Sequence, residues 1–305
     1  MSSPFEDYLA ELHDLDQPLL ASKLAILSDL IPEEVRLLSE SWPDIDAVRR
    51  RQVLYRLVEL AEDNLELDFD GVFLACLADE DGETRATAIE GLCECADRAL
   101  IDHLTGLLMD DAEHAVREAA AVALGKFAML AELGKLLPAD ARKVEEALLA
   151  AFNNVDEKDS VRCKVLEAIA PLSKPYVEDL IREAYHGSSR ELRASALYAM
   201  GQNCNPSWLP ILLTELHSPY PGLRFEAARA CAELEAEEAV PRLVELLDDS
   251  DALVRMCAID ALGGTGGSEA RAALQECLDS PDESVREAAQ EALQEIGFWD
   301  NPSAP

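Results

Sequence analysis

The residue types that most often carry out chemistry in proteins are sparse in this chain, and their spacings match no familiar site. The five histidines, at positions 13, 103, 114, 186 and 217, form no H-x-x-x-H pair, and none is followed by glutamate. The eight cysteines are scattered, and the C-x-C pair of Cys93 and Cys95 lacks the second ligand pair that a zinc site needs. We therefore expect buried free thiols in a reducing compartment.

Other catalytic signatures are equally weak. The glycine cluster GGTGG (263–267) lacks the G-K-[ST] ending of a phosphate-binding loop and follows a helical pattern, so it predicts a turn between helices. No G-x-S-x-G nucleophile motif occurs. With 61 acidic residues, the nomination of any carboxylate pair as acid and base carries almost no information. The sequence predicts no enzyme, no catalytic residue, no metal and no cofactor.

The charge of the chain limits its partners. Its 305 residues include 26 lysines and arginines and 61 aspartates and glutamates, which gives a net charge of −35. Such a surface repels nucleic-acid backbones and anionic lipid, so we expect a basic partner protein, although a salty cytoplasm would also favour this acidity. No apolar run approaches the about 20 residues of a membrane span, and no secretory signal is visible. We expect a soluble, cytoplasmic monomer.

A recurring arginine reveals an internal repeat. From Arg162 onward the spacing is 31 residues, whereas Arg117 precedes Arg162 by 45 residues and Arg85 precedes Arg117 by 32. A degenerate copy surrounds positions 49–51. A fixed period of this kind is typical of repeat arrays, and it predicts about eight units. The repeated arginines, taken as offset zero of each unit, are Arg85, Arg117, Arg162, Arg193, Arg224, Arg255 and Arg286.

Each unit carries the pattern of two amphipathic helices. Offsets −1, +3, +6 and +7 are nearly always apolar, as in Val254, Ala258, Ala261 and Leu262, and they share one helical stripe. A second apolar stripe precedes each arginine. Each unit is therefore predicted to be a helical hairpin in an all-α fold. A glycine recurs at offset +8 and is predicted to end the second helix, in the copies Gly125, Gly201 and Gly263.

The unit, an acidic loop followed by V-R-x-x-A-x-x-A-L-G, resembles HEAT-type repeats of the subclass seen in bilin lyases, over residues 41–297. The resemblance implies a right-handed α-solenoid whose second helices line the concave face. Deoxyhypusine hydroxylases, HEAT-repeat enzymes that hold two irons through His-Glu pairs, are disfavoured because such pairs are missing. The repeated arginines are predicted to be a structural ladder, each with its stem on the next hairpin and its guanidinium at an acidic loop such as Asp248-Asp249.

Positions that differ between units are the candidates for function. Offsets +1 and +5 point away from the buried stripe and are expected to face the concave groove. In the later units they hold large side chains rimmed by charges, as a partner groove would. The alternative is that these side chains fold over the groove wall. The predicted partner-binding residues are Glu167, Tyr198, Phe225, Arg229, Met256 and Asp260. Glu287 and Glu291 are also expected to help select a basic partner.

The remaining segments give the predicted domain boundaries. Residues 1–40 do not fit the period and are expected to form an N-terminal helical cap. The 14-residue excess in the long unit predicts an extended repeat junction over 126–146, where the second helix passes its glycine and a new helix begins at Pro138. Residues 298–305 are predicted to be a C-terminal tail, with Phe298 and Trp299 plugging the last hairpin.

The sequence favours a non-enzymatic scaffold or adaptor that binds a basic or helical segment of another protein in its concave groove. Two alternatives stay open. One is a bilin lyase-like subunit that handles a tetrapyrrole, with Arg229 receiving a propionate. The other is an acidic decoy for basic nucleic-acid-binding proteins.

Overall fold

The computed structural model describes residues 4–300, with side chains to Ile296. These residues form eighteen α-helices and four short 3-10 helices, and the described part contains no strand. The prediction of an all-α fold is confirmed, and the sequential pairwise packing of the helices is that of a HEAT-like solenoid. The chain divides into two compact units, residues 1–161 and 162–305.

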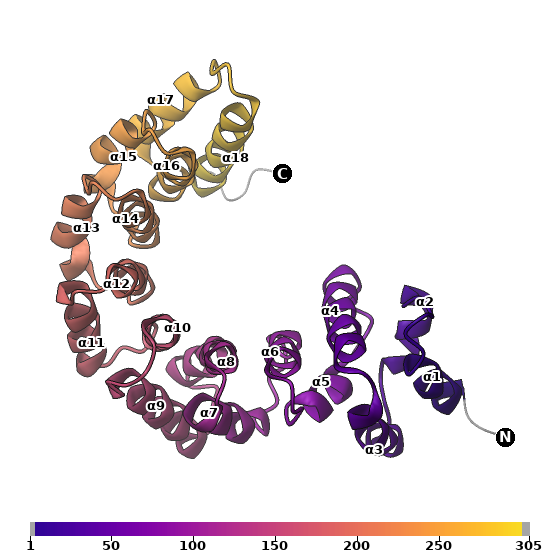
Figure 1. The fold of residues 1–305 in the computed structure, drawn as a ribbon. Coiled ribbons are helices and arrows are strands. Elements are labelled where there is room, and N and C mark those ends of the chain that lie inside the picture. Colours follow the sequence, from indigo (N-terminus) through magenta and orange to yellow (C-terminus); the bar gives the residue numbers. More distant parts are fainter. Residues whose placement is uncertain (1–3, 301–305) are drawn as a thin grey trace. The chain divides into compact units, whose positions relative to one another are not determined.

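Unit 1 contains two rows of helices. In Figure 1 α4, α6 and α8 follow one another on one side, with α5, α7 and α9 on the other. The order of packing agrees, since α4 packs on α6, α6 on α8, α3 on α5 and α7 on α9. The helices of this unit are α1 (Pro4–Leu12), α2 (Ala21–Leu24), α3 (Pro32–Ser41), α4 (Ala47–Asp63), α5 (Asp70–Cys76), α6 (Gly82–Gly91), α7 (Leu100–Asp110), α8 (His114–Glu132) and α9 (Pro138–Asn153). Helix α10 (Asp159–Ile169) contains the division between the units.

Unit 2 repeats the same plan. Its second helices α12, α14, α16 and α18 form one row, on the inside of the curve that this unit makes, and α11, α13, α15 and α17 form the other (Figure 1). The bounds are α11 (Pro175–His186), α12 (Arg190–Gln202), α13 (Leu209–Glu215), α14 (Pro221–Glu233), α15 (Val240–Leu246), α16 (Ala252–Thr265), α17 (Gly267–Cys277) and α18 (Glu283–Asp300).

The predicted apolar stripe is the core of each second helix. In α16, Val254, Ala258, Ala261 and Leu262 are each at most 1% exposed. Many of these positions are alanine, whose small side chain allows neighbouring second helices to approach closely. The stripe therefore fixes which face of each second helix is buried and which is free.

The glycines at offset +8 have a different role from the one predicted. Helices α8, α12 and α16 continue through Gly125, Gly201 and Gly263. A Cβ atom at Gly201 would lie 2.9 Å from the Ala230 Cα atom, closer than real Cβ contacts. Gly201 therefore permits the close approach of α12 and α14 rather than ending a helix.

The segment predicted to be an extended junction contains the end of one helix and the start of the next. Helix α8 passes Gly125 and runs to Glu132, and α9 begins at Pro138. The turn between them has Gly134 at φ +66°, and the Lys135 amide donates to the Leu130 carbonyl at 2.8 Å. This bond pattern is a Schellman cap, which explains why the longer second helix ends here.

Three ladder arginines join neighbouring hairpins through carboxylates. The Arg85 guanidinium donates from Nε and Nη2 to both carboxylate oxygens of Asp111, at 2.8 and 2.7 Å. Its Nη1 donates to the Asp79 carbonyl, six residues earlier, at 2.7 Å. Arg117 makes the same set of bonds to Glu157 and to the carbonyl of Asp111. Such two-pronged, charge-assisted contacts fix both distance and orientation between hairpins.

Arg224 repeats the arrangement in unit 2. Its guanidinium donates to the two carboxylate oxygens of Asp249 at 2.6 and 2.7 Å and to the Ser218 carbonyl at 2.8 Å. The Asp249 carbonyl in turn accepts from Arg255 Nη1 at 2.8 Å. Asp249, like Asp111, is thus shared by two arginines of successive hairpins.

The other ladder positions depart from this pattern. Arg193 bonds Glu215 and the Tyr185 hydroxyl, and Arg162 lies 3.7 Å from Glu183. Arg255 and Arg286 differ from the prediction that every ladder arginine joins two hairpins: the bonds recorded for them go to carbonyls of their own hairpin loops. For Arg255 the reason lies in the sequence of the next loop. Asp111 and Asp249 each stand six residues before the arginine of their hairpin, whereas the residue six positions before Arg286 is Ser280.

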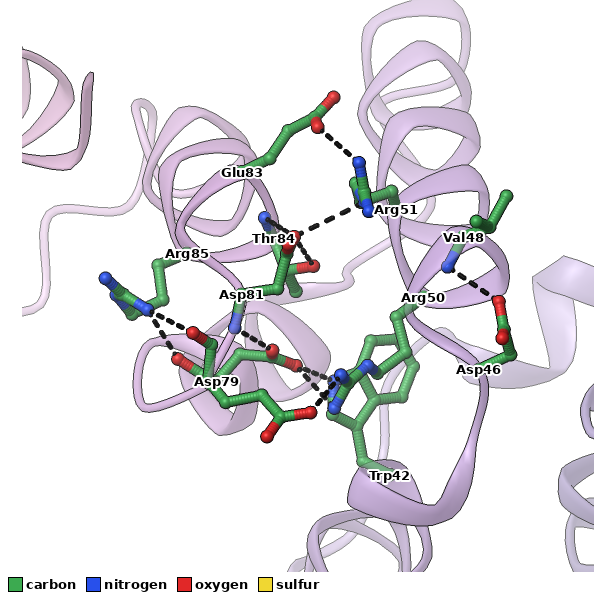
Figure 2. A network of polar contacts seen from close by, with 11 residues as sticks. Trp42, Asp46, Val48, Arg50, Arg51, Asp79, Asp81, Glu83, Thr84 and Arg85 are labelled. Atoms are coloured by element: carbon green, nitrogen blue, oxygen red, sulfur yellow. Dashed lines mark hydrogen bonds and ion pairs between the residues drawn. The ribbon is translucent and has the colours of Figure 1, made fainter. Parts of the chain in front are cut away.

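The first joint of this kind is built around Asp79 (Figure 2). Its Oδ2 atom accepts a hydrogen bond from Trp42 Nε1 at 2.7 Å and lies 3.3 Å from Arg50 Nη1. Its Oδ1 atom accepts from the Asp81 amide at 2.8 Å. The side chains of Arg50 and Asp79 are 3% and 0% exposed, so this ion pair between α4 and the loop before α6 is fully buried. Arg50, absent from the predicted ladder, is therefore its first member.

The two ends bear on the predicted boundaries. Helix α3, within the segment predicted to be a cap, packs on α5 as the first helices of successive hairpins do. Helix α18 runs to Asp300, into the segment predicted to be a tail. Residues 301–305 and the side chains of Phe298 and Trp299 lie outside the described part. None of the helices within residues 4–300 combines the length and apolar character needed to cross a bilayer.

Candidate functional site

The buried stripe of each second helix leaves its opposite face free. In α14, Leu223, Ala227 and Cys231 are buried, whereas Phe225 is half-buried and Arg229 is exposed. The same alternation occurs in the neighbouring helices α12 and α16. Offsets +1 and +5 therefore share one face along the row of second helices in unit 2.

A pocket of about 500 Å³ lies on this face between α14, α16 and α18. Its apolar lining comes from Phe225, Met256 and Leu253, and the Leu253 side chain is 70% exposed. Its charged lining comes from Arg229, Glu233, Asp260 and Glu295. We call this pocket the unit 2 groove. Four of the six predicted binding residues, namely Phe225, Arg229, Met256 and Asp260, meet in it.

Tyr198 lies next to the groove and stacks against Arg229, the cation that lines the groove. The Arg229 guanidinium lies over the Tyr198 ring, 4.5 Å from the ring centroid. Arg229 Nη1 is also 3.8 Å from Glu226 Oε2, a buried atom without a hydrogen-bond donor. Burial raises the pKa of Glu226, although the charge of Arg229 opposes that rise. The stacking contact fixes the guanidinium at the α12 side of the groove.

Glu167 is engaged elsewhere. Its Oε1 atom accepts from the buried Ser195 hydroxyl at 2.7 Å, and its Oε2 atom accepts from Lys164 Nζ at 2.8 Å. Glu167 does not line the unit 2 groove. It belongs to a polar cluster of α10 and α12, so it differs from its predicted role as a groove carboxylate.

The α16 and α18 side of the groove is negative. Asp260 is exposed, and its pKa is raised by partial burial and then by the charges of Glu291 and Glu295. Among the described residues no lysine or arginine forms an ion pair with Asp260, Glu233, Glu291 or Glu295. Glu233 and Glu295 were not predicted as binding residues, whereas Glu291, at offset +5, was expected to help select a basic partner. These carboxylates are uncompensated on the protein itself and available to an external cation.

The groove lacks the groups of an activated nucleophile. The Cys257 thiol lines it and donates a hydrogen bond to the Phe225 carbonyl at 3.4 Å. Burial, followed by the charges of Asp260 and Glu226, raises the pKa of Cys257 to about 12. The thiolate, which is the nucleophilic form, is therefore negligible near neutral pH. No group of three metal-ligating side chains occurs within the described residues.

Comparison with known proteins agrees with this architecture. The model of the family described as HEAT repeats matches residues 71–152 and 209–294, which is more than half of the chain. No curated protein sequence matches. The complex of CpcE and CpcF of phycocyanin lyase from Nostoc sp. PCC7120 is similar in structure, with 16% identity, a TM-score of 0.54, and coverage of 92% of this chain and 96% of that chain. Human deoxyhypusine hydroxylase in complex with glycerol has 22% identity and a TM-score of 0.39, with 96% of each chain covered.

Proposed function

The chain belongs to the HEAT-repeat family, and we propose that it is a non-enzymatic protein-binding scaffold whose unit 2 groove binds a basic segment of a partner protein. The observation that carries this proposal is the combination of exposed apolar side chains with carboxylates that have no cation of their own. Apolar contacts supply affinity, and uncompensated charges select partners of opposite sign and speed their encounter. HEAT-like architecture alone carries no function.

The two sides of the groove have different charge. On the α12 side the lining cation Arg229 is near Glu226. On the α16 and α18 side the charged residues that line the groove, Asp260 and Glu295, are both carboxylates. A partner segment that fits has an apolar side chain between Phe225 and Met256 and its basic side chains towards α18.

The test is affinity capture from the native host with wild type and with a Phe225→Ala/Met256→Ala double variant. Because buried anchors in interfaces often contribute 2 kcal/mol or more, we expect loss of at least about 30-fold in affinity for the captured partner. Val122→Ala/Met129→Ala, which truncates two exposed side chains of α8 (50% and 40% exposed), is the matched control. Equal capture by the groove variant and the control would refute the groove assignment.

A second variant tests the contribution of the groove carboxylates to partner binding. Asp260→Asn/Glu295→Gln keeps the shape of the groove and removes two negative charges. We expect slower association with the captured partner and a weaker dependence of the rate on salt concentration. Association kinetics that match wild type at every salt concentration would show that these carboxylates do not recognise the partner.

The bilin lyase-like alternative requires the same groove to hold a tetrapyrrole. Arg229 offers a cation for a propionate, but Glu233, Asp260 and Glu295 line the same pocket and would repel it. Titration with a free bilin distinguishes the two functions. A change in bilin absorbance that disappears in Arg229→Gln would favour the alternative.

The acidic decoy alternative depends on total charge rather than on the groove. It predicts that the chain competes with DNA for basic proteins, and that high salt abolishes the competition. It also predicts that Phe225→Ala/Met256→Ala competes as well as wild type. The same variant therefore distinguishes the decoy from the groove-binding scaffold.

A further inference from the structure

Unit 1 contains a buried cation that is bound by backbone carbonyls. Arg49, in the first turns of α4, is 3% exposed. Its Nη2 atom donates to the carbonyls of Asp14 and Gln17, both at 2.9 Å, and its buried Nε atom has no acceptor. It forms no ion pair among the described residues, whereas Arg50 and Arg56 on the same helix do. A buried guanidinium with an empty donor position is unfavourable unless an acceptor reaches it.

A second donor without a partner lies near this cation. Tyr8 of α1 is 4% exposed, and its hydroxyl has no hydrogen-bond partner. Burial and then Glu11 raise the pKa of Tyr8 to about 12, and the charge of Arg49 acts in the opposite direction. The hydroxyl is thus a proton donor at neutral pH. Arg49 and Tyr8 both lack an acceptor in the same part of unit 1.

A pocket of about 560 Å³ adjoins Arg49, between the segment 15–19 and α4. Its apolar lining includes Leu15 of the segment, which is 55% exposed, and Tyr55 of α4, which is 61% exposed. Its polar lining includes Arg49, Gln52 and Arg56 of α4. A ligand with one acidic group and an apolar body would match both kinds of lining.

We propose that this pocket binds a carboxylate carried by an apolar group, with the carboxylate at Arg49 and the apolar body on Leu15 and Tyr55. Asp16 and Glu59 also line the pocket, so a singly charged carboxylate suffers less repulsion than a doubly charged phosphate. Two sources carry this chemistry: the C-terminus of a protein that ends in an apolar residue, and a free small carboxylic acid. The site is separate from the unit 2 groove and does not depend on its function.

The test is calorimetric titration of the full chain with four probes. N-acetyl-leucine and an eight-residue peptide that ends in leucine each carry the carboxylate, and their amidated forms lack it. We expect a carboxylate form to bind at least about tenfold more tightly than its amide, because hydrogen bonds to charged groups are the stronger ones. Binding of the peptide alone identifies a protein C-terminus, and binding of N-acetyl-leucine as well identifies any apolar carboxylate. Equal affinity of acid and amide, or no binding of any probe, overturns the proposal.

Variants then locate the site. Leu15→Ala should weaken binding by about threefold to tenfold, since it shortens an exposed apolar side chain of the wall. Leu65→Ala, at a side chain that is 95% exposed and outside the pocket, is the matched control. Arg49→Gln should abolish the preference for acid over amide. Because Arg49 also holds the segment 14–17, Arg56→Gln is the second charge variant, and it should reduce the preference without loss of fold. A preference that none of these variants changes would place the carboxylate elsewhere.

Discussion

Replacement of Asp79 by asparagine tests whether the buried joint in Figure 2 holds unit 1 together. Asp79→Asn removes the charge that faces Arg50 and puts an amide in place of one of the two oxygens that accept from Trp42 and from the Asp81 amide. Removal of one partner of a buried ion pair costs about 3–5 kcal/mol. Glu80 still accepts from Arg50 Nη2 at 2.9 Å, so we expect the lower end of the range, about 3 kcal/mol.

The assay is urea unfolding followed by tryptophan fluorescence. The chain has three tryptophans, and a Trp208→Phe/Trp299→Phe background leaves Trp42 as the reporter of unit 1. For a unit of this size, a loss of 3 kcal/mol also corresponds to a fall in melting temperature of about 6–12 °C. The control is Glu80→Gln, whose side chain is 81% exposed and should cost no more than about 1 kcal/mol. If Asp79→Asn and Glu80→Gln lose the same free energy of unfolding, the buried ion pair is not what stabilises this joint.

Two further predictions concern unit 2. Gly201→Ala should lower the free energy of unfolding by about 1–3 kcal/mol, because its new Cβ atom would meet Ala230. Gly222→Ala, whose Cβ atom would meet nothing within 4 Å, should be neutral or stabilising, and a reversed order in urea unfolding would contradict the close-packing argument. The Arg224 guanidinium donates hydrogen bonds to Asp249 and lowers the pKa of that carboxyl group in the folded state. The ionised carboxylate therefore stabilises the fold above the pKa of an unfolded aspartate, about 3.9. This stability is lost as pH falls through the lower pKa of the folded state. In urea titrations from pH 7 to pH 2, Asp249→Asn should be less stable than wild type at pH 7 and lose less on acidification; parallel curves would contradict this.

The sequence predicted the repeat because burial imposes a strict period. Val254 and Ala258 recur at fixed offsets, since each must meet the same neighbours in the next hairpin. The arginine at offset zero recurs because it joins its hairpin to an acidic residue of the next one, as Arg85 and Arg224 do. Its carboxylate partners were harder to find, because acidic residues fill every loop, but an aspartate six residues before the arginine, as in Asp79, Asp111 and Asp249, was a visible signal.

The candidate sites depended on details that periodicity does not contain. Offsets +1 and +5 brought Phe225 and Met256 into one groove, but the same rule selected Glu167, which Ser195 and Lys164 engage. A side chain is available only if its neighbours leave it free, and those neighbours come from other repeats. Likewise nothing in the run of arginines at 49–51 distinguished Arg50 from Arg49, which forms no ion pair with the residues that the structure describes.

The shared aspartates have a consequence for how such an array changes its length. At the joints of Arg50, Arg85 and Arg224, an arginine on one hairpin pairs with an aspartate six residues before the arginine of the next hairpin. At the joint of Arg117 the acid is Glu157, five residues before Arg162. The hairpin that carries Arg117 also carries Asp111, so it has an acid for the preceding hairpin and an arginine for the following one. A copy of this hairpin could therefore form the same ion pairs with both of its neighbours. Duplication is easy at such joints, and it is harder beside Ser280, because Arg255 forms no ion pair within the described part of the chain.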